Sequence, residues 1–362
     1  MFRDCAFVLI EFCNTIMIPH SAFMLRCLEL AAKGGGYVAP NPMVGAVLVY
    51  QDQIIGEGWH KQYGDPHAEV NCLQSVKPEH QSLIAKSTLY VSLEPCAHHG
   101  KTPPCTDLII RHAIPRVVIG CTDTFNKVSG KGIAQLKAAG IEVITGIEEA
   151  ACQNSNRRFF TFHEQQRPYV FLKWAQSADG FLAPEPVQQQ MLSNPFSQRL
   201  VHKMRSEEAA ILVGYQTARI DNPKLNNRLW TGPSPMRVVI DRDLSLPNHL
   251  HMFSDHQPTL IINGLKNANS GTIRWRKMDF INNTAASILN ILHEENLLSV
   301  LIEGGSQTLD LFLASGLWDE AFIVQTGVTL QRGIPAPGLR DAHLQEQYAL
   351  GNDQIAIFIR QS

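Results

Sequence analysis

The chain has 362 residues, enough for two domains of ordinary size that each bury their own core. Apolar residues make up 44% of it and charged residues 18%, which excludes a disordered or fibrous protein and is typical of a globular one. The formal net charge of -2 gives no sign of the basic face that nucleic-acid binding requires, so we expect no nucleic-acid partner.

Residues 6–18 form a fairly apolar segment after Arg3, a pattern that weakly resembles a signal peptide. Asp4 and Glu11 interrupt the pattern, no small-residue cleavage site follows, and the segment is too short to span a membrane. An alternative is that Met17 is the true start, and the sequence leaves both readings open. No other segment approaches the length of a transmembrane helix, so we expect no membrane partner.

The next part of the chain alternates helix and strand patterns. Apolar residues recur at helical spacing over residues 23–31, and a glycine run follows them. Residues 44–50 and 53–59 are strand-like and close enough for a hairpin, and Asp65-Pro66 predicts a helix start with Asp as N-cap. The remaining predicted elements are strands 88–93, 116–121 and 141–145 and helices 107–112 and 133–139. This order predicts a three-layer α/β sheet.

Residues 147–167 are polar and predict a linker, which gives a first domain at 20–146 and a second at 168–362. The second domain again alternates strands with helices, which favours a largely parallel sheet. Its predicted strands are 169–175, 209–213, 237–241, 259–263, 299–303 and 320–325, and its predicted helices are 195–204, 285–294 and 306–313.

The eight cysteines are spread through the chain, and none follows Cys152. This is not the distribution of a secreted disulfide scaffold, so we expect a reducing, cytoplasmic setting. Two of them, Cys96 and Cys105, stand among His, Glu and Pro residues, and this setting needs a chemical explanation.

The strongest chemical signal is His67-Ala68-Glu69 followed by Cys96 and Cys105. Zinc takes nitrogen and sulfur ligands, and a catalytic site uses three protein ligands plus a water whose pKa the metal lowers toward neutrality. One histidine and two cysteines supply those ligands, while Glu69 is suited to transfer protons. An H-x-E followed by P-C and a second cysteine is the signature of zinc nucleobase deaminases.

Two prolines predict how the ligands are presented. Pro66 and Pro95 each stand where a helix could begin, so we expect His67 and Cys96 at helix N-termini, where exposed N–H groups favour a thiolate. Residues two apart in mid-helix point to nearly opposite sides. His67 and Glu69 can therefore reach one site only at a helix start.

The cysteine spacing departs from that signature, because eight residues separate Cys96 from Cys105 instead of two. The motif alone leaves a structural zinc site, or no zinc, as alternatives. A non-catalytic zinc module is therefore one rival interpretation. Another is a deaminase of a different nucleobase, nucleoside or tRNA, with a C-terminal half of unrelated role.

Residues 41–47, 56–60, 67–70 and 94–105 closely resemble the bifunctional deaminase/reductase family of riboflavin biosynthesis. The resemblance runs from about Ser21 to the C-terminus, and the long insert between the cysteines is typical of that family. It implies a cytidine-deaminase-like three-layer α/β/α domain followed by a dihydrofolate-reductase-like α/β domain. It also implies a small phosphorylated pyrimidine as substrate, and a homo-oligomer stays open.

For the first domain, the resemblance implies hydrolytic deamination of 2,5-diamino-6-(5-phosphoribosylamino)pyrimidin-4(3H)-one. By the same resemblance His67, Cys96 and Cys105 bind Zn²⁺, and Glu69 is the catalytic proton carrier. The implied substrate contacts are Asn41, His60, His98, Lys101, Thr102 and Asp123. A phosphate needs a cation such as Lys101, although Lys101 and the histidines could also be solvated loop residues.

One stretch departs from the family. Its usual Asp-Pro-Asn-Pro is Asp123-Thr124-Phe125-Asn126 here, so the family's third-position Asn has no counterpart.

Read from its residues alone, the C-terminal half gives weaker signals. No G-x-G-x-x-G follows a strand, so the Rossmann fingerprint is missing. A strand does run into Glu303-Gly304-Gly305-Ser306 and then a helix, where backbone N–H groups can approach a phosphate. A tight turn with no ligand is an equally good interpretation of that segment.

The resemblance continues through residues 173–180, 205–206, 213–228 and 303–305, and it implies NADPH-dependent reduction of the ribosyl group to ribityl. The implied substrate contacts are Lys173, Arg205, Leu225, Arg228 and Glu303. The implied cofactor contacts are Gln176, Thr217, Asp221, Gly305, Ser306 and Gln307. Without the resemblance, Asp221 would belong to a plain turn and Arg205 to a helix surface.

A second departure lies near the expected cofactor. The family commonly has an aromatic residue in this segment, and this chain has Gln190-Met191-Leu192. Gln189 and Met191 are therefore weaker candidates for cofactor contact.

Overall fold

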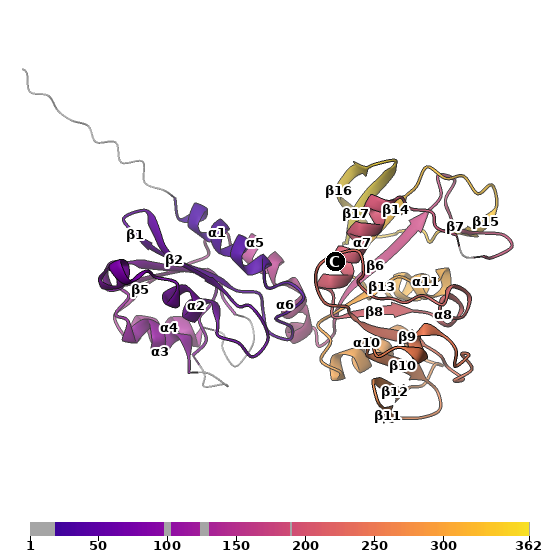
Figure 1. Cartoon of the computed structure of the whole chain (residues 1–362), viewed down its shortest axis with the longest axis horizontal. Coiled ribbons are helices and arrows are strands. Elements are labelled where there is room, and N and C mark those ends of the chain that lie inside the picture. Colours follow the sequence, from indigo (N-terminus) through magenta and orange to yellow (C-terminus); the bar gives the residue numbers. More distant parts are fainter. Residues whose placement is uncertain (1–18, 98–102, 124–129, 189, 362) are drawn as a thin grey trace, which may run out of the picture.

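The computed structural model describes residues 19–97, 103–123, 130–188 and 190–361. The chain forms two lobes that lie side by side in Figure 1, the first running from α1 to α6 and the second from β6 onward. Each lobe is built on its own β-sheet with helices packed against it.

The first lobe is a sheet with helices on both faces. Its helices are α1 (His20–Ala32), α2 (Ala68–Gln74), η1 (Pro78–Lys86, a 3-10 helix), α3 (Cys105–Arg111) and α4 (Lys131–Ala138). Its strands are β1 (Gly45–Tyr50), β2 (Gln53–Trp59), β3 (Thr88–Leu93), β4 (Arg116–Cys121) and β5 (Glu142–Thr145). The strand order is β2-β1-β3-β4-β5, with β1 antiparallel to both neighbours and the rest parallel. The predicted three-layer α/β/α domain is confirmed.

Alternating side chains of this sheet feed two hydrophobic cores. Leu48 of β1 packs with Ile109 of α3 on one face, and Val49 packs with Met24 of α1 on the other. Because β3 and β4 are covered on both faces, their sequences are nearly continuous apolar runs rather than alternating ones.

The starts of α2 and α3 differ from the predictions. Helix α2 begins at Ala68, with His67 as its N-cap, rather than at Asp65-Pro66. The prediction that Cys96 stands at a helix N-terminus is wrong, because Cys96 lies in the loop after β3. Since a residue before proline avoids the helical conformation, the Pro103-Pro104 pair delays the helix until Cys105.

Residues 147–167, predicted as a polar linker, form two helices: α5 (Glu149–Ser155) and α6 (Arg157–Glu164). Helix α5 packs against α1 and β4, and Cys152 and Phe160 are buried in the same core as Met24. Many polar residues of the segment lie on its outer side, but Asn156 and Thr161 are buried. The domain boundaries given above stay a prediction.

The second lobe is a ten-stranded sheet in the order β11-β12-β10-β9-β8-β13-β6-β14-β17-β16. Its strands are β6 (Tyr169–Gln176), β8 (Ala210–Val213), β9 (Met236–Ile240), β10 (Thr259–Asn263), β11 (Ala268–Ser270), β12 (Ile273–Lys277), β13 (Ser299–Ile302), β14 (Glu320–Gln325), β16 (Ala342–Leu350) and β17 (Asp353–Arg360). Its helices are α7 (Pro195–Glu207), α8 (Tyr215–Asp221), α9 (His251–Ser254), α10 (Thr284–Glu294) and α11 (Ser306–Ser315). Seven neighbouring strands of this sheet, β12, β10, β9, β8, β13, β6 and β14, are all parallel. The predicted largely parallel sheet is therefore confirmed.

Several strands of this lobe were not predicted from the sequence. They are β11, β12, β16, β17 and the small separate pair β7 (Phe181–Pro184) and β15 (Gly333–Pro335). Strand β16 is mostly exposed and rich in polar residues, so it carries no apolar alternation and depends on pairing with β17.

Candidate active sites of the two lobes

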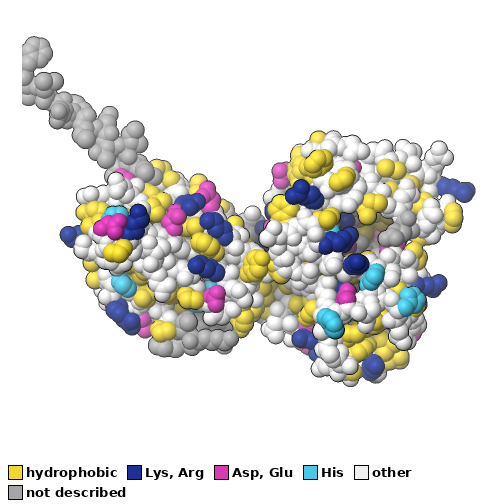
Figure 2. All heavy atoms as spheres, viewed as in Figure 1, with side chains coloured by type: hydrophobic (Ala, Val, Ile, Leu, Met, Phe, Trp, Pro, Cys, Tyr) yellow, Lys and Arg dark blue, Asp and Glu magenta, His cyan; other side chains and the backbone are white. Residues whose placement is uncertain are grey.

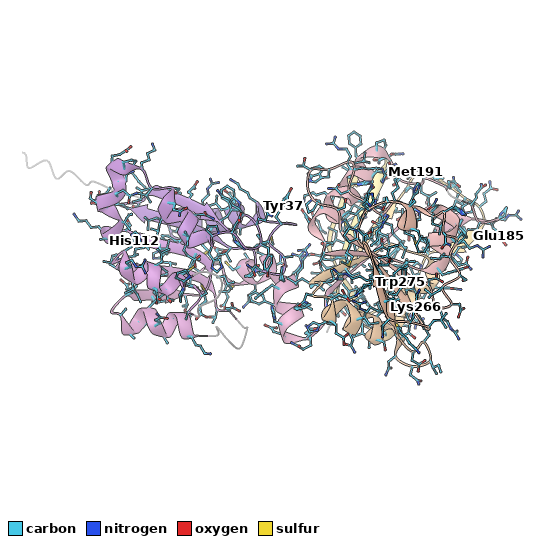
Figure 3. All side chains as sticks on the ribbon, turned by 60° about the horizontal axis from the view of Figure 1, so that its bottom comes forward. Tyr37, His112, Glu185, Met191, Lys266 and Trp275 are labelled. Carbon is cyan, nitrogen blue, oxygen red and sulfur yellow. The ribbon has the colours of Figure 1, made fainter. Side chains whose placement is uncertain are left out.

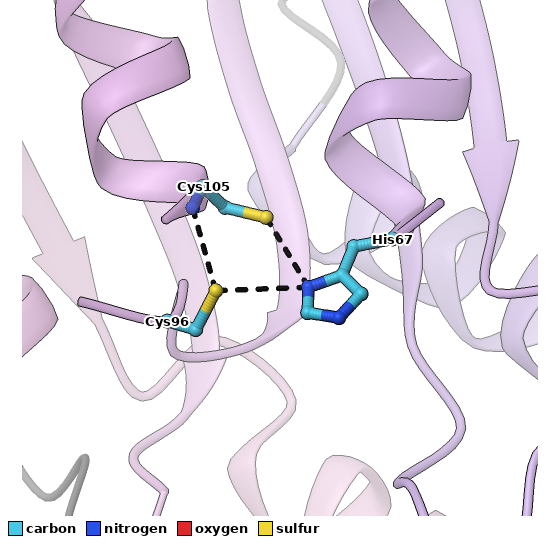
Figure 4. A group of neighbouring side chains, drawn as sticks. All are labelled: His67, Cys96 and Cys105. Atoms are coloured by element: carbon cyan, nitrogen blue, oxygen red, sulfur yellow. Dashed lines mark hydrogen bonds between the residues drawn. The ribbon is translucent and has the colours of Figure 1, made fainter. Parts of the chain in front are cut away.

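Three predicted ligands meet at one point of the first lobe (Figure 4). His67 is the N-cap of α2, Cys96 follows β3, and Cys105 is the first residue of α3. The Nδ1 atom of His67 lies 3.6 Å from Cys96 Sγ and 3.4 Å from Cys105 Sγ, and the three candidate ligand atoms all lie within 4.8 Å of one another. A tetrahedral zinc ion holds nitrogen and sulfur ligands about 3.5 Å apart, so these residues fit such an ion.

The two cysteines differ in how readily they become anions: the hydrogen bond to Cys96, and then burial, raise the pKa of Cys105, whereas the pKa of Cys96 is lowered. The Cys105 thiol and the His67 ring both hydrogen-bond Cys96 and lower its pKa to about 4. The backbone N–H of Cys105 also donates to Cys96 Sγ at 3.3 Å. Thiolates are the form in which cysteine binds zinc, so the surroundings of Cys96 favour metal binding.

Glu69 lies beside this cluster in the first turn of α2 and is 3% exposed. Burial, followed by the nearby Cys96, raises the pKa of its carboxyl group. The Cys105 thiol hydrogen-bonds to Glu69, which places the carboxylate next to the ligands. The expectation that His67 and Glu69 share a site only at a helix start agrees with this arrangement.

Two predicted substrate contacts border the cluster. The His60 ring lies 5.5 Å from the His67 ring, centroid to centroid, and Asn41 Nδ2 lies 3.1 Å from His60 Nε2. His60 also donates its backbone N–H to Val44 O at 3.0 Å, which ties it to the loop that carries Asn41. Burial lowers the pKa of His60, which favours a neutral ring at this position.

Other predicted residues of this site divide into two groups. Asp123 is buried two residues after β4, and its backbone N–H donates to Glu94 Oε2 at 3.3 Å. His98, Lys101, Thr102 and Phe125 lie outside the described residues.

Glu94 is a buried residue of the segment 94–105, and the sequence alone assigned it no role. Its carboxylate accepts backbone N–H groups of Asp123, Gly130, Gly132 and Ile133 at 2.9 to 3.3 Å. A Cβ on Gly132 would lie 2.1 Å from Pro95 O, so only glycine allows this approach. Glu94 therefore fixes Asp123 and the start of α4 against the segment that leads to Cys96. Its place directly before Pro-Cys at a strand end was the signal available in the sequence.

In the second lobe, three predicted substrate contacts form one charged cluster. Arg205 of α7 donates from Nε and Nη2 to both carboxylate oxygens of Glu303, at 2.9 and 2.7 Å. Burial raises the pKa of Glu303, but the charges of Arg205 and Lys173 outweigh burial and hold this pKa at about 2. Burial lowers the pKa of Lys173, whose amine on β6 faces Glu303 and Arg205.

His202 joins this cluster, and the sequence interpretation missed it. It stands one helical turn before Arg205, and its Nδ1 accepts the backbone N–H of Arg228 at 3.1 Å. Arg205 also donates to Asn226 O at 3.2 Å, so α7 holds the loop that carries Leu225 and Arg228. Leu225 is buried on that loop with φ of 51°. Figure 2 shows Lys, Arg and His side chains gathered around a hollow on this lobe.

Four of the predicted cofactor contacts, Thr217, Gly305, Ser306 and Gln307, lie near the point where β8 and β13, which pair in the sheet, end beside each other. A Cβ on Gly214 would lie 2.3 Å from Thr308 Oγ1, and a Cβ on Gly305 would lie 3.1 Å from Thr217 Oγ1. The two glycines let the turn after β8 pack against the start of α11, where Ser306 and Gln307 begin the helix and backbone N–H groups can meet a phosphate. This glycine-lined cradle is the candidate site for the phosphates of a dinucleotide.

The remaining cofactor candidates are less closely grouped. Asp221 is the last residue of α8, and burial raises the pKa of its carboxyl group. Gln176 ends β6, and its side chain accepts from Trp174 Nε1 at 2.9 Å. Met191 is 65% exposed and labelled in Figure 3, and Gln189 lies outside the described residues.

Among the helices of the described residues, none combines the length and the apolar character needed to cross a lipid bilayer.

Comparison with known proteins matches both halves of the chain to described families. Residues 17–121 match the cytidine and deoxycytidylate deaminase zinc-binding region, and residues 168–332 match the RibD C-terminal domain. The structure of a diaminohydroxyphosphoribosylaminopyrimidine deaminase/5-amino-6-(5-phosphoribosylamino)uracil reductase from Thermotoga maritima has a TM-score of 0.86 and 34% identity, covering 94% of this chain and 98% of that one. Acinetobacter baumannii RibD has a TM-score of 0.85 and 29% identity, with coverage of 94% and 99%.

A zinc-type His/Cys/Cys cluster on an α/β/α sheet, joined to a lobe with a glycine-lined cradle, defines a deaminase fused to a reductase. The riboflavin biosynthesis protein RibD of Aquifex aeolicus (strain VF5) is 35% identical over 351 residues, which cover 93% of this chain and 98% of that protein. RibD of Synechocystis sp. is 38% identical over 297 residues, 80% of this chain and 79% of that protein. The chain belongs to the RibD family of riboflavin biosynthesis proteins.

Proposed function

We propose that this chain catalyses two successive steps on one phosphorylated pathway intermediate. The first lobe deaminates 2,5-diamino-6-(5-phosphoribosylamino)pyrimidin-4(3H)-one with Zn²⁺, and the second reduces the ribosyl group of the product to ribityl with NADPH. The observation that carries this proposal is the convergence of His67, Cys96 and Cys105 beside the buried Glu69. Membership of the RibD family supports this substrate over another nucleobase.

In the deaminase site, His67, Cys96 and Cys105 would hold the zinc ion, which supplies an activated water near neutral pH when bound. Glu69 accepts a proton from the attacking water and delivers it toward the amino group that leaves as ammonia. Its burial excludes bulk water from this transfer. Asn41 and His60, which lie against each other, would orient the pyrimidine, and Asp123, His98, Lys101 and Thr102 are further candidate contacts.

In the reductase site, NADPH when bound would supply the hydride that reduces C1' of the opened ribosyl group. Lys173, Arg205 and Glu303 would bind and orient the substrate, with Leu225 and Arg228 on the adjoining loop. The turns at Gly214 and Gly305, with Thr217, Asp221, Gln176, Ser306 and Gln307, would hold the cofactor. The chain's contribution is mainly to fix the two reactants in a productive geometry.

The test is ammonia release from the diaminopyrimidine phosphate, NADPH oxidation with the deaminated substrate, and zinc content, measured on the same preparations. Glu69→Gln should keep zinc and the fold, abolish ammonia release and leave NADPH oxidation intact. The control is Glu79→Gln, an exposed glutamate of η1, which should retain both activities. Loss of both activities in Glu69→Gln, or of neither, would contradict two independent sites.

The same assays separate the rival functions. A zinc deaminase of another nucleobase or nucleoside would release ammonia from cytidine or deoxycytidylate but not from the diaminopyrimidine phosphate. A non-catalytic zinc module would release no ammonia, and Glu69→Gln would leave its behaviour unchanged.

The proposal also includes a cytoplasmic location, self-association into a homo-oligomer and the domain boundaries 20–146, 147–167 and 168–362. The absence of cysteine after Cys152 supports the reducing compartment.

A further inference from the structure

Asn156 separates α5 from α6, and Arg157 and Arg158 are the first two residues of α6, the helix that lies where the two lobes meet in Figure 1. Each of them contacts a different part of the molecule. Asn156 contacts the deaminase lobe, whereas Arg157 and Arg158 contact two elements of the reductase lobe. The segment is therefore a physical connection between the two candidate sites.

Asn156 holds the loop that carries Asn41. It is 3% exposed, its Oδ1 accepts the backbone N–H of Met43 at 2.8 Å, and its Nδ2 donates to Met43 O at 2.9 Å. The next residue, Val44, accepts the backbone N–H of His60, whose ring lies beside the ring of His67. Two hydrogen bonds from the buried Asn156 thus fix the segment that places Asn41 and His60.

Arg158 holds the end of α7. Its Nε donates to Glu208 Oε2 at 2.9 Å and its Nη2 donates to Glu208 Oε1, a two-pronged ion pair in which the Glu208 side chain is 1% exposed. Glu208 directly follows α7, the helix that carries Arg205. Arg157 pairs with Glu320 at the start of β14, with Nε 2.8 Å from Oε1.

Polar contacts and local packing both join the lobes around this segment, since Leu298 of the second lobe is buried in the same core as Phe160. A cavity of about 310 Å³ lies here, lined by residues of both lobes that include Asn41, Met43, Glu208 and Ser299. Close packing occurs at Gly36, where a Cβ would lie 2.1 Å from Ser206 O of α7. Tyr37, the next residue, is labelled at this edge of the first lobe in Figure 3.

We propose that Asn156 and Arg158 are positioning residues for the two sites, Asn156 for the pyrimidine-binding loop of the deaminase and Arg158 for helix α7 of the reductase. The proposal rests on the proposed function. Neither residue touches the reacting atoms. Each acts through a neighbour, Met43 in one case and Glu208 in the other.

A positioning role of this kind affects substrate binding more than the chemical step. When Asn156 is removed, the loop can leave its binding-competent conformation, and the apparent affinity falls by the fraction of molecules that remain competent. Two part-buried hydrogen bonds are lost, which corresponds to a roughly tenfold rise in deaminase KM. The ligands and Glu69 are unaffected, so kcat should stay near the wild-type value.

The first experiment measures deaminase kcat and KM, reductase kcat and KM on the deaminated substrate, and zinc content of Asn156→Ala. We expect a raised deaminase KM, with kcat, zinc and both reductase constants unchanged. The matched control is Asn154→Ala, two residues away with an exposed side chain, which should leave every constant unchanged. Asn156→Asp keeps an acceptor for the Met43 N–H and should give an intermediate KM.

Three outcomes would overturn this half of the proposal: a deaminase KM equal to that of Asn154→Ala, a fall in kcat with unchanged KM, or parallel loss of both activities. If Asn156→Ala does not fold, the deaminase KM of Asn156→Asp tests the proposal in its place. If the wild-type enzyme releases no ammonia from the diaminopyrimidine phosphate, the proposed function itself fails. Failure of the positioning role alone gives a different result: the wild-type enzyme is active, and Asn156→Ala has the wild-type deaminase KM.

The second experiment tests Arg158 by removing both charges of its pair, because a lone buried Glu208 would destabilise the fold by itself. Arg158→Met with Glu208→Gln should raise the reductase KM for the deaminated substrate and leave the deaminase constants unchanged. Arg116→Met with Glu142→Gln, an exposed pair on the first lobe, is the control. Reductase constants equal to those of the control would show that the pair does not position α7.

Discussion

His202 is a buried residue that the reductase cluster keeps neutral. Burial first, and then the charges of Arg205 and Arg228, lower its pKa from 6.5 to about 4. A neutral ring is required for its contact, because Nδ1 must accept the Arg228 backbone N–H. His202 therefore holds the loop of Arg228 only while it is unprotonated.

This predicts a pH dependence of stability with a definite sign. Above pH 6.5 both folded and unfolded states carry a neutral His202, and its contribution is fully present. As the pH falls from 6.5 toward about 4, the unfolded state binds a proton that the folded state does not, so the reductase lobe loses stability. His202→Asn retains an acceptor oxygen without the titrating ring and should lose less stability over this range. Urea unfolding at several pH values checks this, and equal pH profiles for variant and wild type would contradict it.

Single residues were predictable from the sequence where the chemistry needs a fixed residue type. His67, Cys96 and Cys105 could be named in advance because few side chains bind zinc, and the structure brings them together. Glu94 and His202 received no role because each acts on backbone N–H groups contributed by distant segments. Nothing in the local sequence states which N–H groups a buried acceptor will meet.

At the scale of elements, the glycine turn between β13 and α11 is the feature on which cofactor binding depends. Gly305 has φ of 56°, a conformation that side chains disfavour, and a Cβ there would lie 3.1 Å from Thr217 Oγ1. Gly305→Ala should therefore raise the KM for NADPH by roughly tenfold, since backbone strain of this kind costs about 1 to 3 kcal/mol. Deaminase activity should be unchanged.

The control for this substitution is Gly338→Ala, because no atom lies within 4 Å of a Cβ placed there. NADPH affinity is measured by steady-state kinetics and by direct titration. An unaltered NADPH affinity in Gly305→Ala would place the cofactor elsewhere in the lobe.

Elements were predictable where burial imposes a period or a run of apolar residues. The buried parallel strands of both lobes were found in this way, and so were the long helices α1, α7 and α10. Strand β16 was missed because it is exposed and gains its conformation from pairing with β17. The helix start at Cys96 was predicted wrongly because Pro103-Pro104, rather than Pro95, decides where the helix can begin.

At the scale of the whole molecule, the two lobes have largely separate hydrophobic cores. Two hydrophobic cores belong to the first lobe. One lies around α2, α3 and α4. The other lies around α1 and also includes Leu298 of the second lobe. The largest core of the second lobe is built from β6, β8, β13, α10 and α11. Separate cores predict separate unfolding transitions, each sensitive to its own ligand.

Removal of zinc should therefore lower the melting temperature of one transition only. Chelation leaves the Cys96 and Cys105 sulfur atoms beside His67 with no ion to hold them, so the first lobe should melt earlier, and added zinc should restore it. NADPH should raise the melting temperature of the reductase lobe. Four of the five tryptophans lie in the second lobe, with Trp59 in the first, so tryptophan fluorescence follows mainly the reductase transition while circular dichroism follows both. A single transition that zinc and NADPH shift together would show that the lobes unfold as one unit, and the contacts of Asn156 to Arg158 would then contribute stability to both lobes as well as position.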